Sequence, residues 1–390
     1  MTSPMHILVV SSEPYLIPNV PLGGIFQHHQ VAALRSIGLK VGVASGGLLP
    51  LRDQLSFRRW QTMERQGGGD VVRRFTKSIV PLRYIPEKYL HRMNIANLVN
   101  AIEAYFRANG RPDCIHAHNL QYAGIAGFEV AKKHGIPLVL TEHSSSFLTG
   151  NFPSVLFTLF CEAVEGSAKN IAVSSSLAAK LNQLFSGSPH PFTVLPNVLD
   201  LEFTPSSSVK DHGNFVFLSI GRLDENKNHE LLIRAFAEAF RSLPVFLRIG
   251  GSGFAENRLK ALTYSLGVEN QVRFLGFLSR DQVEMEFGNA HCFVLPSIRE
   301  TFGVVLIEAL SCGVPVVSTP SGGPYDIIDH SNGIITSDHS VPAMVNALRD
   351  MRKRYPEFDR AKIRTDALTK YSSQSFCIKM VEIYQGAARS

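Results

Sequence analysis

Short apolar runs alternate with segments of helical period along most of this chain. Near the start, HILVVS at residues 6–11 reads as a strand, and the next helical segment ends at Gly38. The alternation returns with the strand FVFLSIG, which begins at residue 215 and precedes a helix over 228–241. Strands separated by helices form βαβ units with right-handed crossovers. The sequence therefore predicts parallel sheets of the α/β class, although residues 51–90 show no clear period.

A polar stretch at residues 204–214, TPSSSVKDHGN, divides the chain. Its proline, three serines and glycine are typical of a linker. The 390 residues are enough for two domains. We expect a Rossmann-like domain over 1–204, a linker over 205–213, a second Rossmann-like domain over 214–371, and an amphipathic helix within 372–390.

The overall composition is that of a globular protein, with 45% hydrophobic and 18% charged residues. No apolar window is long enough for a transmembrane helix, and the first residues, MTSPMHILVV, lack the basic region of a signal peptide. Five scattered cysteines without a C-x-x-C pair indicate buried, reduced thiols. These features predict a cytoplasmic protein.

Positive charge concentrates between residues 51 and 111. This segment holds twelve Lys and Arg against five acidic residues, an excess of seven, whereas the whole chain has a net charge of +6. Such a segment can attract an anionic membrane face, a substrate carrying phosphates, or nucleic acid, and it can also be a solvated surface. Nucleic acid is disfavoured because no stacking aromatic residues interleave with the charges on a recognisable module.

Residues 297–319 place one acid in front of a hydrophobic helix and a second acid inside it. Glu300 lies in the loop after the apolar strand HCFVL, and the predicted helix runs from near Gly303 to Gly313. Ligands bind at the carboxyl ends of strands in open α/β sheets, and a helix amino terminus offers amides to an anion. Glu300 and Glu308 would suit a ligand with hydroxyls on both sides of a phosphate, such as a nucleotide sugar. The alternatives are a capping glutamate and a structural glutamate.

A second strand end adds two cations. Arg222 and Lys227 follow the strand FVFLSIG and precede a helix, where the helix dipole disfavours positive charge. Such a pair can clamp a diphosphate and neutralise a departing leaving group. After the first strand, Gly23 and Gly24 would permit close backbone approach to a phosphate, although a pair of glycines is more often only a turn.

Three histidines, His116, His118 and His143, lie near strand ends. A His-x-His pair with a distant third histidine can bind a metal. The chain has no Asp-x-Asp pair and no suitably spaced cysteines, so we favour hydrogen bonding in a polar cleft and expect neither a metal nor another cofactor. Ser-His-Asp, P-loop and G-x-G-x-x-G signatures are absent from the sequence.

Taken together, the motifs make the chain resemble the retaining glycosyltransferases of family 4. They are GGIFxH (23–28), TEH (141–143), VLPNVLD (194–200), GRLDENK (221–227), ETFGVVLIE (300–308) and PSGGP (320–324). That family has the GT-B fold, with two Rossmann-like, doubly wound domains facing a cleft and a last helix that crosses back to the N-terminal domain. The resemblance implies this fold, with the helix of residues 372–390 packed on the N-terminal domain.

The resemblance also implies roles for individual residues. Glu308 matches the acid that binds the ribose, and Glu300 matches the acid that contacts sugar hydroxyls. Arg222 and Lys227 match the diphosphate clamp. The remaining residues implied are His143 beside the donor sugar, the donor-binding residues Gly23, Gly24, Gly221, Phe302, Gly303 and Val304, and the acceptor-side candidates His28, His118 and Asn197.

The implied activity is metal-independent transfer of a hexose-type sugar, with retention, from a UDP-sugar or GDP-mannose to a glycan or lipid-linked acceptor. GGIFQHHQVAAL with TEH resembles a subgroup associated with bacterial surface polysaccharide assembly. The basic segment would suit a polyprenyl-diphosphate-linked acceptor at an anionic membrane. Two departures from the family pattern are NVLD for Asn-Gly-Val-Asp and Asp326 where Glu is usual. The rivals are a GT-B epimerase or phosphorylase and a non-catalytic nucleotide-sugar-binding partner of another transferase.

Overall fold

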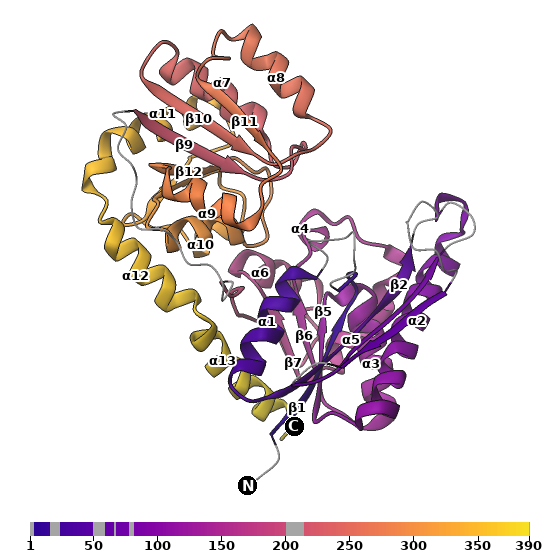
Figure 1. The fold of residues 1–390 in the computed structure, drawn as a ribbon. Coiled ribbons are helices and arrows are strands. Elements are labelled where there is room, and N and C mark those ends of the chain that lie inside the picture. Colours follow the sequence, from indigo (N-terminus) through magenta and orange to yellow (C-terminus); the bar gives the residue numbers. More distant parts are fainter. Residues whose placement is uncertain are drawn as a thin grey trace. The chain divides into compact units, whose positions relative to one another are not determined.

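The computed structural model describes residues 4–15, 24–49, 59–65, 68–77, 82–199 and 214–389. The chain divides into two units (Figure 1). Unit 1 comprises Met1–Val198 together with Ser373–Ser390, and unit 2 comprises Leu199–Ser372. The predicted linker at 205–213 lies outside the described residues. The chain returns from unit 2 to unit 1 beside residue 372, where we expected the last helix to begin.

Unit 1 is built on an eight-stranded sheet in the order β3-β4-β2-β1-β5-β6-β7-β8. Its strands are β1 (His6–Ser11), β2 (Lys40–Leu49), β3 (Arg59–Glu64), β4 (Val71–Lys77), β5 (Cys114–His118), β6 (Leu138–Glu142), β7 (Lys169–Ala172) and β8 (Phe192–Val194). Its main helices are α1 (Ile25–Ser36), α2 (Glu87–Asn109), α3 (Ile125–His134), α4 (Ser146–Thr149), α5 (Phe157–Glu165), α6 (Ser175–Leu184) and α13 (Ser373–Ala387). All described strand pairs are parallel except β3 with β4.

The antiparallel pair β3–β4 occupies the region in which the sequence shows no clear period. Strand β4 buries Arg73, whose Nε donates to Tyr15 O at 2.8 Å and whose Nη1 pairs with Glu64 Oε2 at 2.9 Å. An inward-facing arginine breaks the alternation of apolar and polar residues on which strand prediction depends. Because both ends of the guanidinium are partnered, the buried charge is tolerated.

The last helix, α13, closes the core of unit 1. Its residues Phe376, Met380 and Tyr384 are buried in one cluster with Val9 of β1 and Val31 of α1. Each such side chain contributes about 1.5–3 kcal/mol by leaving water. The prediction that the final helix packs on the N-terminal domain is confirmed.

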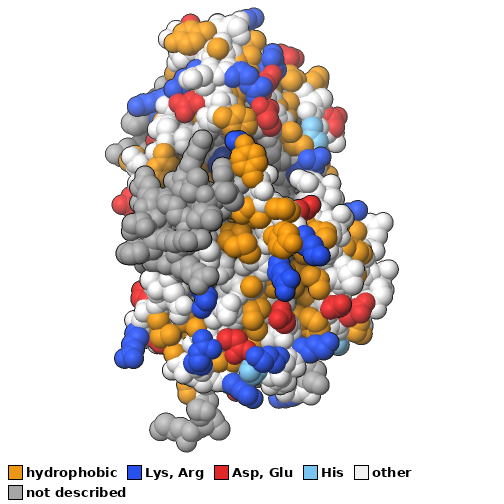
Figure 2. Space-filling model, turned by 90° about the vertical axis from the view of Figure 1, so that its right-hand side faces the viewer, with side chains coloured by type: hydrophobic (Ala, Val, Ile, Leu, Met, Phe, Trp, Pro, Cys, Tyr) orange, Lys and Arg blue, Asp and Glu red, His pale blue; other side chains and the backbone are white. Residues whose placement is uncertain are grey.

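Helix α2 covers the sheet on its inner face and exposes apolar and basic side chains on its outer face. Figure 2 looks onto this side of unit 1, where orange apolar side chains interleave with blue basic ones. Tyr89 and Met93 are among the exposed apolar residues. No helix within the described ranges is long and apolar enough to cross a membrane.

Unit 2 is a six-stranded parallel sheet in the order β11-β10-β9-β12-β13-β14. Its strands are β9 (Phe215–Ile220), β10 (Val245–Gly250), β11 (Val272–Gly276), β12 (Cys292–Leu295), β13 (Val316–Ser318) and β14 (Gly333–Ile335). Its helices are α7 (His229–Phe240), α8 (Glu256–Ser265), α9 (Arg280–Gly288), α10 (Val304–Ser311), α11 (Val341–Arg354) and α12 (Arg360–Tyr371).

In each unit the order of the parallel strands reverses at one point. The order in unit 2 is the Rossmann order 3-2-1-4-5-6, and it reverses between β9 and β12. In unit 1 the corresponding point lies between β1 and β5. The prediction of two Rossmann-like α/β units is confirmed, and ligands of such sheets bind at the carboxyl side of the reversal point.

Candidate functional site

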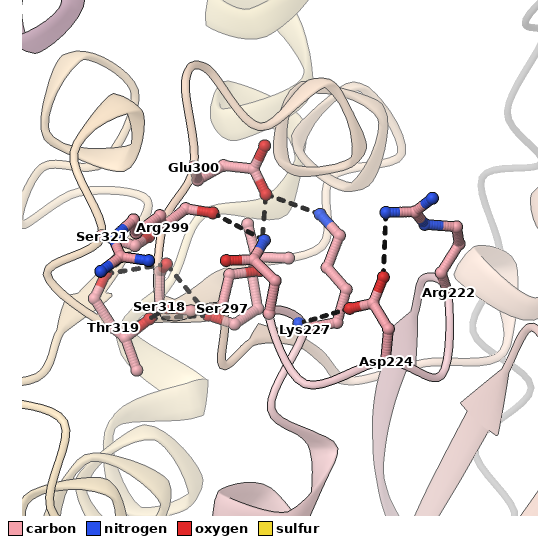
Figure 3. A network of polar contacts seen from close by, with 11 residues as sticks. Arg222, Asp224, Lys227, Ser297, Arg299, Glu300, Ser318, Thr319 and Ser321 are labelled. Carbon is pink, nitrogen blue, oxygen red and sulfur yellow. Dashed lines mark hydrogen bonds and ion pairs between the residues drawn. The ribbon is translucent and has the colours of Figure 1, made fainter. Parts of the chain in front are cut away.

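Charged side chains meet at the carboxyl ends of β9 and β12 in unit 2 (Figure 3). Lys227 Nζ and Glu300 Oε2 form an ion pair at 2.7 Å. The two residues are 73 positions apart and come together because β9 and β12 are neighbouring parallel strands. The ion pair therefore lies where the strand order of the unit 2 sheet reverses, between β9 and β12.

The backbone and a nearby hydroxyl hold Glu300 in place. Its N–H donates to Ser321 O at 2.8 Å, and its carbonyl accepts from Gly323 N at 2.8 Å. Ser297 Oγ lies 3.4 Å from Glu300 Oε2, the same oxygen that binds Lys227. The side chains of Glu300 and Lys227 remain 15% and 22% exposed. The pair is therefore oriented and still accessible to a ligand.

Asp224 binds both Arg222 and Lys227 in the loop between β9 and α7. Its Oδ2 accepts from Arg222 Nη2 at 2.9 Å, and its Oδ1 accepts from the backbone N–H of Lys227 at 3.0 Å. Figure 3 shows Asp224 between Arg222 and Lys227. The Arg222 side chain is 82% exposed, so most of its guanidinium donors face solvent. Sequence reasoning missed Asp224, although an acid between two strand-end cations was a usable signal.

A glycine allows two strand-end loops of unit 2 to touch. Gly251, which follows β10, has φ +122°, and a Cβ built on it would lie 1.9 Å from Gly221 O. Gly221 in turn donates its N–H to Gly250 O at 3.0 Å. Only glycine combines this backbone conformation with such an approach. The loop that carries Arg222 is thus braced against its neighbour.

The amino end of α10 lies beside Glu300. Gly303, with φ +98°, precedes the helix, and a Cβ built on it would lie 3.4 Å from Glu300 Cγ. Phe302 is buried, with its ring 6.0 Å from that of Tyr371. Phe302 can therefore offer a ligand only its backbone. The first amides of an α-helix, here from Val304 onward, have no partner within the helix and carry partial positive charge.

Glu308 lies further along α10 and is largely buried. Its Oε1 is 3.5 Å from Nη1 of Arg280, the first residue of α9. The cation offsets the desolvation of the largely buried carboxylate. Arg280 was not recognised from the sequence, because its proximity to Glu308 depends on where α9 and α10 lie in the folded unit.

In unit 1 the carboxyl ends of β5 and β6 carry a cluster of imidazoles. His118 Nδ1 and His143 Nε2 are 3.0 Å apart, and their rings stack with centroids at 5.2 Å. His116 lies against His118 and binds Tyr384 Oη at 2.7 Å and Thr141 Oγ1 at 2.8 Å. The structure thus places two of the predicted site residues, His118 and His143, in direct contact.

Burial keeps these imidazoles neutral. It lowers the pKa of His143 to about 4, against the opposing effect of the Asn197 side chain, and lowers the pKa of His116 to about 3. The pKa of His118 also lies well below its usual value because of burial. Between neutral rings, one nitrogen of the His118–His143 contact donates and the other accepts. Burial raises the pKa of the adjacent Glu142 to about 7, although three backbone amides donate to its carboxylate.

The other predicted residues of unit 1 lie at the start of α1 and after β8. Gly24, with φ +68°, donates its N–H to Glu13 Oε2 at 3.1 Å. His28 Nδ1 is 3.3 Å from Tyr15 Oη, and Asn197 Oδ1 accepts from Gln30 Nε2 at 3.5 Å. Gly23 lies outside the described residues. Asn197 is therefore joined to α1 through Gln30.

Within the described ranges, no group of three or more His, Cys, Asp or Glu side chains is arranged to hold a metal ion. In the His116–His118–His143 cluster, four of the six ring nitrogens contact one another or hydroxyl groups, whereas His143 Nδ1 is buried without a hydrogen-bond partner among the described residues. A metal ligand needs a free lone pair directed at a common point. The cluster is a hydrogen-bonded stack of rings.

Comparison with known proteins shows the family to which this chain belongs. The family model "Glycosyltransferase Family 4" matches residues 31–203, and "Glycosyl transferases group 1" matches residues 201–366. D-inositol 3-phosphate glycosyltransferase of Pseudarthrobacter chlorophenolicus is 31% identical over 283 residues, which cover 66% of this chain and 67% of that protein. The chain belongs to glycosyltransferase family 4. The resemblance inferred from the motifs is confirmed, and the protein is a glycosyltransferase.

Another relative in the family comes from Campylobacter jejuni. It is N-acetylgalactosamine-N,N'-diacetylbacillosaminyl-diphospho-undecaprenol 4-alpha-N-acetylgalactosaminyltransferase, 33% identical over 248 residues, which cover 58% of this chain and 67% of that protein. Sucrose-phosphate synthase from Thermosynechococcus elongatus is a structural neighbour with a TM-score of 0.77, 20% identity, and coverage of 97% and 98% of the two chains. Anabaena HepE in complex with UDP matches with a TM-score of 0.72, 19% identity, and coverage of 98% and 100%. These likenesses confirm the GT-B fold.

Proposed function

We propose that this family 4 glycosyltransferase moves a hexose-type sugar, with retention and without a metal ion, from a nucleoside-diphosphate sugar to a glycan or lipid-linked acceptor. The observation that carries the proposal is the Lys227–Glu300 pair at the β9–β12 reversal point, beside the amino end of α10. A nucleoside-diphosphate sugar has its phosphates between a ribose and a sugar. Cations, helix amides and two carboxylates at one sheet edge match that order of groups.

The diphosphate is the part of the donor that the cations suit. Lys227 has three N–H donors, so it can keep its contact with Glu300 while it binds a phosphate oxygen. Arg222 is held by Asp224 through one nitrogen and has further donors in solvent. Together with the amides at the start of α10, these groups can stabilise the charge that develops on the departing phosphate. Metal-independence is therefore part of the proposal.

The hydroxyl groups of the donor suit the carboxylates. Glu308, partnered by Arg280, would accept hydrogen bonds from the ribose, and Glu300 would accept them from the sugar. Phe302, Gly303 and Val304 would contribute backbone atoms only. This assignment leaves the base and the sugar unspecified, so both a UDP-sugar and GDP-mannose fit it.

The reaction that fits these groups is a same-face displacement. The bond from the anomeric carbon to the phosphate oxygen breaks, the bond to the acceptor oxygen forms on the same face, and the departing phosphate oxygen takes the acceptor proton. Glu300 is bound to Lys227 and so is a poor nucleophile. His143, as a neutral imidazole held by His118, would donate a hydrogen bond to the donor sugar without adding charge. The protein then acts by positioning and by charge stabilisation.

The proposed acceptor is supported by residues of unit 1 and by the name of a related protein. The name of the Campylobacter jejuni relative includes a diphospho-undecaprenol group, which supports a polyprenyl-diphosphate-linked acceptor here. His28, His118 and Asn197 are our acceptor-side candidates, although His118 and Asn197 are buried and would act mainly through His143. With such an acceptor, the protein would work in bacterial polysaccharide or glycoconjugate synthesis in the cytoplasm, peripherally at the inner membrane face.

Nucleotide binding tests the donor site directly. We would measure thermal unfolding with UDP, GDP, ADP and CMP, each with magnesium and with EDTA. One nucleoside diphosphate at about 100 times its Kd should stabilise the protein by about 2.7 kcal/mol, with or without metal. Glu308→Ala should abolish this stabilisation, whereas Glu357→Ala, an exposed glutamate of unit 2, should leave it unchanged. Absence of stabilisation by every nucleotide would contradict the proposal.

Turnover separates the proposal from its rivals. A transferase releases nucleoside diphosphate from its donor in proportion to the acceptor supplied. An epimerase changes the nucleotide sugar with no acceptor present, and a non-catalytic partner binds it without turnover. Formation of a new nucleotide sugar in the absence of acceptor would favour the epimerase.

A further inference from the structure

Unit 1 has an apolar groove of about 460 Å³ between α2, α3 and the segment that leads into α5. Its apolar walls are Ile95, Val99, Ile125, Val155, Leu156 and Leu159. Ile125 and Leu156 are buried and form the floor, while Val155 is 56% exposed at the rim. The groove lies wholly within unit 1, and the Lys227–Glu300 pair lies in unit 2. The donor-site proposal makes no use of it.

Basic side chains stand at the end of the groove nearest the start of α2. Lys88 and Arg92 line it, are both exposed, and lie one helical turn apart. The acid beside them, Glu87, binds His91 Nε2 at 3.1 Å. On the lining itself, the acidic group is Glu129 of α3. The amino end of α2 is therefore positively charged where it meets the apolar lining.

Large apolar side chains that do not line the groove are exposed just before α2 and in its first turns. Tyr84 is 67% exposed and Tyr89 is 58% exposed, and Met93 is one turn further along α2. Arg83 stacks over the Tyr84 ring at 4.8 Å. The orange and blue side chains that alternate on this side of the molecule in Figure 2 show the same mixture. Tyrosine and basic residues around an apolar patch are the composition of a surface that lies at a membrane interface.

We propose that this groove binds an acidic phospholipid of the bilayer, with one hydrocarbon chain against Ile95 and Val99 and the headgroup phosphate at Lys88 and Arg92. An apolar floor, open at the rim and closed at one end by cations, is complementary to a molecule with an apolar chain and an anionic head. The exposed tyrosines would then sit among the headgroups. This inference deepens the membrane location within the proposed function and depends on no step of sugar transfer.

Vesicle flotation tests the site. The protein is mixed with phosphatidylcholine vesicles or with phosphatidylcholine–phosphatidylglycerol vesicles, and the floated fraction is measured. Wild type should float with the phosphatidylglycerol vesicles only. Lys88→Glu/Arg92→Glu should lower the floated fraction by about ten-fold or more, because it reverses two headgroup contacts. Val155→Asp, at an exposed position, should lower it similarly by placing a charge at the rim of the hydrocarbon site.

The matched control is Arg107→Glu/Lys132→Glu, which makes the same change of charge on exposed positions of α2 and α3 away from the groove lining. It should float like wild type. Equal loss in this control would overturn the site in favour of general charge attraction, and normal flotation of Val155→Asp would overturn the hydrocarbon contact. Failure of wild type to float would overturn the whole inference. Every variant should keep wild-type stabilisation by nucleotide, so failure of the donor site would be seen separately.

Discussion

Unit 1 and unit 2 each carry a polar cluster at the carboxyl ends of their parallel strands, but the two clusters differ in charge. In unit 2, Lys227 and Glu300 form an ion pair that is partly exposed. In unit 1, His116 and His118 are neutral and almost fully buried. Burial penalises the charged form of any titratable group, so a strand-end cluster stays charged only where solvent or a ligand can reach it. We infer that unit 2 supplies charge for the reaction and unit 1 supplies shape and hydrogen bonds.

The largest effect should come from removing the charge in unit 2. Lys227→Ala should reduce turnover by about 10²–10³-fold, because it deletes a donor to the departing phosphate. Stability should fall much less, since the pair is partly exposed. Lys260→Ala removes an ion pair of the same 2.7 Å length from an exposed face of unit 2 and is the matched control. Normal turnover in Lys227→Ala would break the assignment of charge stabilisation to unit 2.

Acid should weaken unit 1 more than unit 2. Burial lowers the pKa of several described histidines, and these are His6, His116, His118 and His143 in unit 1 and His229 in unit 2. The unfolded chain binds a proton near pH 6.5, whereas folded His116 binds one only near pH 3. The buried neutral histidines therefore contribute fully to the free energy of unfolding above pH 6.5. This contribution is lost on acidification, by about 2 kcal/mol for His116 at pH 5. Glu142, with its pKa raised to about 7, opposes part of this loss.

Hydrogen exchange measures this difference between the units. Protection factors for amides of β5 and β6 should fall between pH 7.5 and pH 5, after correction for intrinsic exchange rates. Those of β9 and β10 should fall less. Equal loss of protection in both units would show that the imidazole cluster does not set the acid sensitivity of unit 1.

A smaller effect should follow from one hydroxyl in unit 1. Tyr384→Phe removes the Oη that lies 2.7 Å from His116 Nδ1 and leaves that nitrogen buried without its partner. The free energy of unfolding should fall by about 1–2 kcal/mol in chemical denaturation. Tyr264→Phe changes an exposed tyrosine of unit 2 and should have no measurable effect. Equal stability of the two variants would mean that the hydrogen bond contributes nothing to unit 1.

The smallest change in stability is expected for Arg222→Ala. The side chain is 82% exposed and its ion pair with Asp224 is open to solvent on the arginine side. We expect the free energy of unfolding to change by less than about 0.5 kcal/mol, while turnover falls. Thermal unfolding and a donor-release assay on the same preparation would measure both. A large loss of stability would assign Arg222 a structural role in place of a chemical one.

The sequence predicted the positions of the unit 2 residues better than their partners. Strand-end loops could be recognised from periodicity, so Arg222, Lys227 and Glu300 were expected at one edge. The pairing of Lys227 with Glu300 depends on β9 lying beside β12, which the alternation of strands and helices does not specify. The contact of Arg280 with Glu308 depends on where two helices lie in the folded unit, and this is even harder to predict from local sequence patterns.

Unit 1 was harder to predict for a related reason. The imidazole stack needs β5 beside β6 and Tyr384 from the far end of the chain, so nothing local in the sequence indicates it. Helix α2 and the pair β3–β4 went unrecognised because buried polar residues such as Arg73 and Asn97 interrupt the apolar pattern. Where the core itself contains partnered polar groups, hydrophobic periodicity is a weak guide.

The place of α13 in the core of unit 1 has a consequence for synthesis. Residues 373–387 are made after all of unit 2, yet Phe376, Met380 and Tyr384 complete the apolar cluster around β1 and α1. A domain that folds during translation can do so only once all of its residues have left the ribosome. Unit 2, an uninterrupted stretch of chain, can therefore fold first, and unit 1 is completed only after it.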